Sequence, residues 1–464
     1  MALTTNSGAD SAVRGLKANI RGQVIQPGDD GYDEARTVYN AMIDRRPAVV
    51  VRPTGAADVM AAVDFAREHD LVIAVKGGGH NVAGNAVCDG GLQIDLCNMT
   101  SVRVDTEART VHVGPGARLG DVDHETAPLG LVAPAGVVSI TGVAGLALGG
   151  GFGYLCRKHG LTIDNLRSID LVTAQGELVH ASAERNPDLF WGVRGGSGNF
   201  GIVTNFEFAL HELEGVLAGL LIYPAAEAHS VVRSWWEHAA NAPDELSVWL
   251  NFSTAAPEPF IPEVYHGKRI LSVIPIFSGA VEDGWEAIAP FKKLGTLLAD
   301  TVEPWRFVEW QQAFDASYPA GERYFWKSHN FKSPSAEALD CITDHAISPP
   351  TPETRVSVTH LGGAVNRVPS DATAYPHRDA DFLVNITTRW QSPNQDDACI
   401  GWTREYFEAL APHATGGTYV NFTTESDGEQ SMAYLENYDR LVALKNKWDP
   451  DNLFRLNQNI KPTV

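Results

Sequence analysis

The stretch AVVVRPTGAADVMAAVDFAREHDLVIAVKGGGHN, residues 48–81, sets the expected fold of the amino-terminal part of the chain. Its first apolar run, AVVV, precedes a segment with the apolar spacing of a helix, and a second apolar run, LVIAV, follows that segment. This order predicts a βαβ unit. Three glycines, Gly77 to Gly79, come directly after the second predicted strand and directly before His80.

Short apolar runs separated by turns continue to about residue 210. LQIDL, residues 92–96, is a predicted strand, and SVRVD with TVHV, residues 101–105 and 110–113, predict a hairpin. A second hairpin is predicted around the turn at Gln175 and Gly176, and a helix near residues 119–130. We therefore expect the region up to about residue 210 to form one α/β unit.

The pattern changes in the middle of the chain. Apolar runs at residues 219–225, 269–277 and 381–390 alternate with amphipathic stretches rich in tryptophan and tyrosine. This arrangement predicts an antiparallel sheet with helices. Near the carboxyl end, residues 434–454 predict a helix that ends at Trp448, because a proline follows two residues later.

Net charge, apolar runs and cysteine content exclude several classes of partner and site. The 464 residues carry a formal charge of -21, which argues against nucleic acid or an anionic membrane as partner. No stretch approaches the roughly 20 apolar residues of a membrane span, and the first residues lack a secretory pattern, so a soluble, cytoplasmic protein is expected. Five cysteines without a CxxC pair predict no disulfide framework and no metal site, and we expect packed, reduced thiols.

Glycine clusters occur three times in the first half, at residues 77–79, 141–155 and 191–208. Glycine allows the backbone to approach a ligand closely, so that its N–H groups can converge on a phosphate. A dinucleotide-binding GxGxxG fingerprint would need a helix to begin at once, but another turn, with Gly84, follows the first cluster. The three clusters together predict one long, phosphate-bearing ligand.

Five ordered blocks carry a resemblance to a known family. They are residues 52–81, residues 134–166, residues 188–204, YPHRDA at 375–380, and the closing pair YVNF at 419–422 with residues 446–460. Together they resemble the flavin-dependent oxidases of the vanillyl-alcohol oxidase superfamily, in the berberine-bridge-enzyme-like branch that includes bacterial 6-hydroxynicotine oxidases and oligosaccharide oxidases. The resemblance covers nearly the whole chain.

The resemblance implies an α+β fold with three parts. Residues 1–210 would form a two-subdomain FAD-binding domain of the PCMH type. Residues 211–415 would form a substrate-binding domain, with an antiparallel sheet flanked by helices. Residues 416–464 would return to the FAD-binding domain.

His80 is the implied attachment site of FAD, through the 8α-methyl carbon of the flavin. A neutral imidazole is a competent nucleophile near pH 7. The resemblance also implies a set of cofactor-binding residues around it. They are Lys76, Gly77, Gly78, Gly79, Asn81, Gly84, Val138, Thr141, Gly142, Gly145, Gly149, Gly151, Asn199, Gly201, Ile202, Asn421, Asn457 and Asn459.

Many relatives have a second link to FAD, through a cysteine in a PAGxCPTVG segment. This chain has PAGVVSITG there, and Val138 occupies the cysteine's place. Cys156 lies 18 residues later, too far along the chain to substitute, so we interpret it as a packed thiol. A single histidyl link is therefore expected, which favours smaller substrates.

Tyr419, in TYVNF, matches the family's catalytic base, and Asn421 would position the flavin or the loop. A tyrosine has a pKa near 10 and needs a helper to act as a base. Three candidates occur in one segment, Tyr324, Lys327 and His329, and the sequence does not decide between them. The 6-hydroxynicotine oxidases lack this tyrosine, which weakens any transfer of their substrate.

Other middle-domain residues have two interpretations. Trp326 and Trp390 could stack against a sugar or an aromatic ring, but core packing explains such residues equally well. His377 and Arg378 could bind a charged substrate, although we favour the structural corner that the family has there.

Three hypotheses for the activity remain. The first is an FAD-linked oxidase that takes a hydride from an alcohol, hemiacetal or amine carbon and reduces O2 to H2O2. The small Thr141, at the position before Gly142 that governs oxygen access in the family, favours it. The second is a dehydrogenase of the same fold with another acceptor. The third, a flavin-binding protein without turnover, is disfavoured by Tyr419.

Overall fold

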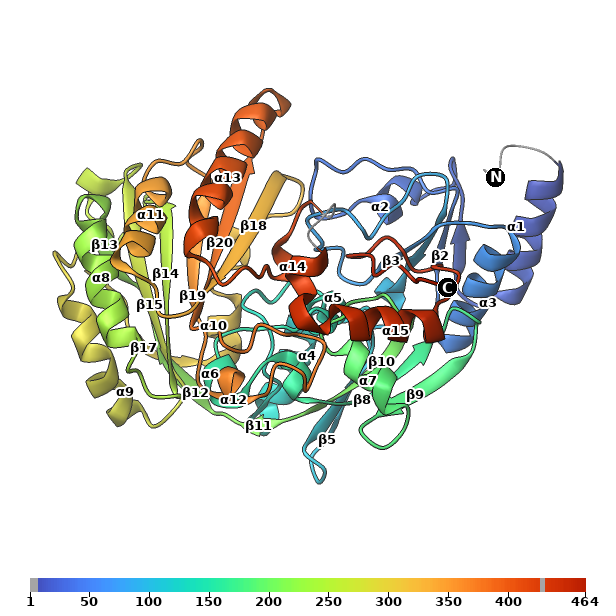
Figure 1. The fold of residues 1–464 in the computed structure, drawn as a ribbon, viewed down its shortest axis with the longest axis horizontal. Helices are drawn as coiled ribbons and strands as arrows, with labels where there is room; N and C mark the ends of the chain where they lie inside the picture. Colours follow the sequence, from blue (N-terminus) through green and yellow to red (C-terminus); the bar gives the residue numbers. More distant parts are fainter. Residues whose placement is uncertain (1–6, 426–429) are drawn as a thin grey trace.

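A computed structural model describes residues 7–425 and 430–464. Figure 1 shows two parts side by side: the amino-terminal half with its smaller sheets, and the middle of the chain built on one large sheet. The red carboxyl-terminal helix lies back against the amino-terminal half. Among the described residues, no helix combines the length and apolar character needed to cross a membrane.

The predicted βαβ unit is confirmed in the first sheet. Strand β2 (Val49–Arg52), helix α3 (Ala56–Glu68) and strand β3 (Ile73–Lys76) follow in that order. Strand β4 (Leu92–Asp95) is inserted between β2 and β3 and is parallel to both. The antiparallel strand β1 (Gln23–Ile25) forms the far edge beside β2, and α1 (Ser7–Asn19) packs on α3.

The second sheet is antiparallel and has the order β5-β6-β10-β8-β9. Both predicted hairpins, β5–β6 and β8–β9, are present. The region that the sequence suggested as one α/β unit thus contains two main sheets, and β10 returns between the two hairpins to join them into the second. Bounds are β5 (Val102–Asp105), β6 (Thr110–Val113), β8 (Leu166–Val172), β9 (Leu178–Ser182), β10 (Ile202–Ala209), with helices α4 (Leu119–Thr126), α5 (Val143–Leu148), α6 (Cys156–His159) and α7 (Pro187–Val193).

The middle of the chain forms a nine-stranded antiparallel sheet, which confirms the prediction of an antiparallel sheet in this region. Its main order is β16-β13-β15-β14-β19-β20-β18, with β12 pairing both β15 and β17. Bounds are β12 (Gly215–Ala218), β13 (Leu221–Pro224), β14 (Leu246–Thr254), β15 (Arg269–Phe277), β16 (Ala299–Asp300), β17 (Glu303–Arg306), β18 (Arg323–Phe331), β19 (Arg355–His360) and β20 (Phe382–Trp390).

Helices cover one face of this large sheet. They are α8 (Ala228–Ala239), α11 (Ala336–Ala346) and α13 (Asp396–Leu410), seen on the left of Figure 1. Alternate strand residues such as Leu250, Val358 and Val384 join them in one apolar core. Because strand side chains alternate between faces, the intervening residues lie on the opposite face.

The carboxyl-terminal segment is held to the amino-terminal half by buried polar contacts. Helix α15 (Tyr438–Trp448) ends at Trp448, as predicted, and packs on α7. The buried Lys445 pairs with Asp449 at 2.5 Å and donates to the carbonyl oxygens of Asn199 and Phe454, each at 2.8 Å. The side chain of Asn199 in turn accepts from the backbone N–H of Ile460 at 3.1 Å. Residues near 199 and 457 are thereby brought together.

Candidate active site

One cavity lies between the glycine-rich segments and the open face of the large sheet. Its first wall combines residues from all three glycine clusters, which the sequence predicted to share a ligand. Its second wall comes from the large sheet and from the segment after Thr418. Among the lining residues are Gly77, Gly78, Gly79, His80, Asn81, Val138, Thr141, Gly142, Gly145, Gly201, Ile202, Trp249, Trp326, Ser357, Thr359, Asn385, Tyr419, Asn421, Asn457 and Gln458.

Gly78 and Gly142 bring two glycine clusters into backbone contact. A Cβ atom on Gly78 would lie 2.6 Å from the Cα of Gly142, and one on Gly142 would lie 2.5 Å from the nitrogen of Gly78. Only hydrogen fits at both positions. A Cβ on Gly145, by contrast, would meet no atom within 4 Å, so this glycine leaves its backbone open to the cavity.

His80 lies in the cavity wall as a half-buried, uncharged imidazole. Its ring stacks on Tyr39 with 4.5 Å between centroids, and Tyr39 stacks on Tyr324 at 4.7 Å. Burial, assisted by the nearby Arg118, lowers the pKa of His80 to about 4. At neutral pH the imidazole therefore keeps a lone pair for a nucleophilic reaction.

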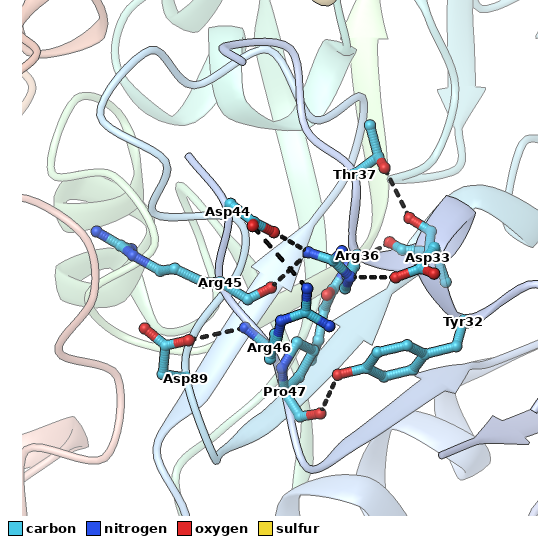
Figure 2. A network of polar contacts seen from close by, with 11 residues as sticks. Tyr32, Asp33, Arg36, Thr37, Asp44, Arg45, Arg46, Pro47 and Asp89 are labelled. Atoms are coloured by element: carbon cyan, nitrogen blue, oxygen red, sulfur yellow. Dashed lines mark hydrogen bonds and ion pairs between the residues drawn. The ribbon is translucent and has the colours of Figure 1, made fainter. Parts of the chain in front are cut away.

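A polar network fixes the loop that follows His80. Arg45 donates to the carbonyl oxygens of Gly84 and Val87 at 2.9 and 3.1 Å. The neighbouring Arg46 donates its backbone N–H to Asp89 at 2.7 Å, as Figure 2 shows, and its carbonyl oxygen accepts from the backbone N–H of Gly90 at 2.8 Å. The segment that carries Tyr39 and the loop after His80 are thus tied to each other, which limits the movement of the imidazole.

Tyr419 is buried in the second wall, and two donors contact its phenol oxygen. The backbone N–H of Gly151 donates at 3.0 Å and the amide of Asn421 donates at 2.9 Å. Burial raises the pKa of Tyr419 to about 12, and these two hydrogen bonds oppose the rise. Because the oxygen accepts in both contacts, the phenol O–H remains available to a ligand in the cavity.

The cavity wall carries no ionised side chain among the described residues. Its titratable members are His80 and the three tyrosines Tyr39, Tyr318 and Tyr419. A carboxylate base, the usual alternative for proton removal, is therefore absent from this part of the structure. Tyr419 is the lining side chain best placed to exchange a proton with a bound substrate.

Known proteins share this architecture. The chain matches the description "FAD binding domain" over residues 47–182 and "Berberine and berberine like" over residues 418–461. An FAD-linked oxidoreductase of Dictyostelium discoideum is 31% identical over 98% of this chain and 98% of its own. The (R)-6-hydroxynicotine oxidase of Paenarthrobacter nicotinovorans is 31% identical over 96% of this chain and 97% of its own. The chain belongs to the berberine-like FAD-linked oxidoreductases.

The solved glucooligosaccharide oxidase from Acremonium strictum has the same fold as this family member. It is 25% identical and aligns with a TM-score of 0.87 over 98% of this chain and 100% of its own. That enzyme carries a 6-S-cysteinyl, 8α-N1-histidyl FAD. In the berberine-like chain described here, Val138 lines the cavity, and no described cysteine does. Cys156 is instead buried in an apolar cluster with Phe152, and burial raises its pKa to about 11.

The cavity fits FAD by its own features. Gly78 and Gly142 form a wall without side chains, and Gly145 leaves space beside it. Gln458 is buried, and both atoms of its amide lack a protein partner, so a ligand can supply the missing hydrogen bonds. His80 contributes a neutral imidazole at the same wall.

Six of the expected cofactor residues lie behind the cavity wall. Lys76 donates to the carbonyl of Ala35 at 2.8 Å, and a Cβ on Gly149 would lie 2.3 Å from the Asn421 side chain. Gly149 therefore packs against the lining residue Asn421, and neither Lys76 nor Gly149 lines the cavity. Gly84, in a turn with φ 73°, and Gly151, Asn199 and Asn459 are not lining residues either.

Lys327 and His329 are not placed to assist Tyr419. Both lie on the face of β18 opposite to Trp326, where they pack on Phe407 of α13. Lys327 pairs with Glu425 at 3.2 Å, and His329 contacts the carbonyl of Phe407 at 2.9 Å. The two-residue period of a strand explains this placement, since neighbours of Trp326 in sequence point away from it.

Trp326 alone among the proposed substrate residues lines the cavity in the described structure. Tyr324 is buried behind it and donates its hydroxyl to the carbonyl of Pro319 at 2.5 Å. Trp390 lies in a separate apolar cluster and donates its indole N–H to Asp396 at 2.7 Å. Of these three aromatic residues, Trp326 is thus placed to meet a ligand in the cavity, whereas Tyr324 and Trp390 pack inside the protein.

His377 and Arg378 form the structural corner that the sequence favoured. The guanidinium of Arg378 is buried and pairs with both carboxylate oxygens of Asp164, at 2.7 and 2.8 Å. His377 contacts the carbonyl of Ala433 at 3.0 Å. Neither residue lines the cavity.

Sequence reasoning missed several lining residues. Trp249, Ser357, Thr359 and Asn385 come from three adjacent strands of the large sheet. The alternation of polar and apolar residues in VNIT, residues 384–387, was a signal for a polar face on one strand. Nothing in the sequence showed that this face meets the glycine clusters.

Substitution of Gly142 tests the contact between the clusters. We expect Gly142→Ala to lower the stability by about 1–3 kcal/mol or more and to reduce FAD content, because the new methyl group would overlap the backbone of Gly78. Gly401→Ala is the control, since its Cβ would meet no atom within 4 Å. Thermal unfolding and bound flavin per polypeptide measure both effects. A stable Gly142→Ala protein with full flavin content would contradict this role.

Proposed function

We propose that this enzyme is an oxidase that holds FAD through a single bond to His80 and oxidises an alcohol, hemiacetal or amine carbon. The bound FAD supplies the hydride acceptor. The observation that carries the proposal is the shared cavity, which is lined by an uncharged His80 and the buried Tyr419 and by no ionised side chain among the described residues. His80 has the neutral imidazole that a nucleophile requires, whereas Tyr419 has a raised pKa and depends on the two donors to its phenol oxygen.

Tyr419 is the proposed base. In its phenolate form it removes the proton from the substrate hydroxyl or amine while the hydride leaves the neighbouring carbon. Gly151 and Asn421 donate to the phenol oxygen, and these two bonds stabilise the phenolate against the cost of burial. Asn421 also donates to the carbonyl of Leu146 at 3.2 Å, which fixes its amide.

The two walls support a division of roles along the chain. We assign cofactor binding to residues 1–210 together with 416–464, and substrate binding to residues 211–415, with Tyr419 of the closing segment reaching the second wall. Gly142 and Gln458 represent the first wall, and Trp249 and Asn385 the second. The boundary near residue 210 is bridged by the short strand β11 (His211–Glu212), which pairs with β7 (Leu131–Val132).

Oxygen is the proposed electron acceptor. We expect the purified protein to release one H2O2 per substrate oxidised in a screen of sugars, aromatic alcohols and cyclic amines. After anaerobic reduction, mixing with air should restore the oxidised flavin spectrum within the time of one turnover. Thr141 lines the cavity and leaves room there. Slow reoxidation in air together with fast turnover on an artificial acceptor would favour a dehydrogenase instead.

A further inference from the structure

The cavity-facing side of the large sheet is a continuous polar surface. Asn251, Ser357, Asn385 and Ser328 are direct cross-strand partners on β14, β19, β20 and β18, so they share one face. The carboxamide oxygens of Asn251 and Asn385 are buried and have no partner in the described structure. Buried polar atoms of this kind are normally satisfied, which indicates that a ligand contacts this surface.

Arg355 extends this polar surface towards its outer end. Its cross-strand partner on β20 is Thr387, and the partner of Thr387 on β18 is Trp326, which lines the cavity. Two residues further along β19 lies Ser357, another lining residue. The guanidinium carbon of Arg355 is 5.9 Å from the ring centroid of the lining residue Tyr318. Arg355 is not itself a lining residue, but its neighbours Trp326, Ser357 and Tyr318 are, and they place it beside the cavity.

Arg355 is a cation without a counter-ion among the described residues. No carboxylate of the described residues lies within ion-pair distance of it, although the side chain is half-buried in a chain of net charge -21. Arg389, on the same face, differs: it pairs with Glu322 at 3.0 Å and donates to the carbonyl of Ser317 at 2.9 Å. Arg355 is therefore the cation that a negatively charged ligand would meet here.

Two further hydrogen-bonding groups adjoin Arg355. The indole N–H of Trp326 and the hydroxyl of Thr387 are buried, and neither has a partner in the described part of the chain. We propose that Arg355, Thr387 and Trp326 form a subsite for a carboxylate group of the substrate. One guanidinium balances one negative charge and matches the planar carboxylate with two parallel hydrogen bonds.

This subsite narrows the substrate class of the proposed oxidase, on which it rests. The oxidised carbon lies near Tyr419, whereas the carboxylate lies at the outer end of the polar surface, near Tyr318. The substrate is therefore a hydroxy or amino compound whose acid group is remote from the carbon that is oxidised. Sugar acids and hydroxymethyl-substituted aromatic acids both have this arrangement.

Matched acid and neutral compounds test the subsite directly. Isothermal calorimetry on the holoenzyme would compare 4-(hydroxymethyl)benzoate with its amide, and glucuronate with glucose. We expect the acid to bind at least about tenfold more tightly in at least one pair. In Arg355→Gln this preference should fall below about twofold, while Arg355→Lys should keep part of it because the charge remains.

Arg306→Gln is the matched control, since Arg306 is exposed and pairs with Glu309 elsewhere on the surface. It should leave the acid preference unchanged. Equal binding of acid and neutral compounds by the wild type, or no binding of either pair, would overturn the proposal, as would a preference that survives in Arg355→Gln. Because calorimetry needs no turnover, H2O2 release measured separately shows whether the proposed oxidase activity has failed instead.

Discussion

Tyr419→Phe is expected to slow anaerobic flavin reduction by the best substrate by about 10²–10⁴-fold, which corresponds to about 3–5 kcal/mol. The substitution keeps the ring but removes the proton acceptor. FAD content should stay normal, because Tyr419 acts on the substrate side of the cavity. Rapid mixing with substrate under anaerobic conditions measures the rate.

The same substitution also leaves two donors, from Gly151 and Asn421, without their acceptor. That loss alone is worth about 1–3 kcal/mol of stability, so thermal unfolding must be measured beside the rate. Tyr375→Phe is the control, since the Tyr375 hydroxyl is buried without a described partner and its ring lies 6.2 Å from Tyr419. A loss of rate below about tenfold in Tyr419→Phe would assign the proton transfer to another group.

A pH profile gives an independent test of Tyr419. The pKa of Tyr419 is raised to about 12, so the phenolate is a minor species at neutral pH. The fraction of Tyr419 in the phenolate form increases with each unit of pH. If the phenolate is the base, the reduction rate rises with pH and does not level off until the pH approaches that pKa. The profile of Tyr419→Phe should lack this rise. An equally steep profile in both proteins would contradict the assignment.

His80→Ala is expected to abolish covalent flavin completely. Wild-type protein should retain yellow FAD after acid precipitation and show flavin fluorescence in a denaturing gel, whereas the variant should lose both. Mass spectrometry should find one FAD on the peptide that contains His80, and Cys156→Ser should leave that mass unchanged because this thiol is buried outside the cavity. Flavin that washes out of denatured wild-type protein would disprove the link.

The lowered pKa of His80 predicts how attachment depends on pH. A histidine with an ordinary pKa near 6.5 gains about fourfold in its neutral form between pH 6 and pH 8. With a pKa of about 4, His80 is already neutral across that range. Apo-protein mixed with FAD should therefore form the bond at nearly equal rates at both pH values.

Local patterns in the sequence determined the elements of the fold. The βαβ unit, both hairpins and the end of α15 at Trp448 depend on apolar spacing, turn residues and a proline, all of which act over a few residues. The glycine clusters and His80 were likewise visible, since the order and spacing of these segments are properties of the chain itself.

Only the tertiary structure decided which residues meet. The insertion of β4 between β2 and β3, and the contact between Gly78 and Gly142, join segments far apart in sequence. The two-residue period of a strand predicts that the side chains of Trp326 and Lys327 point to opposite faces of β18. Which of these faces meets the cavity depends on the packing of α13 against β18. The isolation of Arg355 from any described carboxylate is equally a result of packing, because charge balance depends on distance in space and not on distance along the chain.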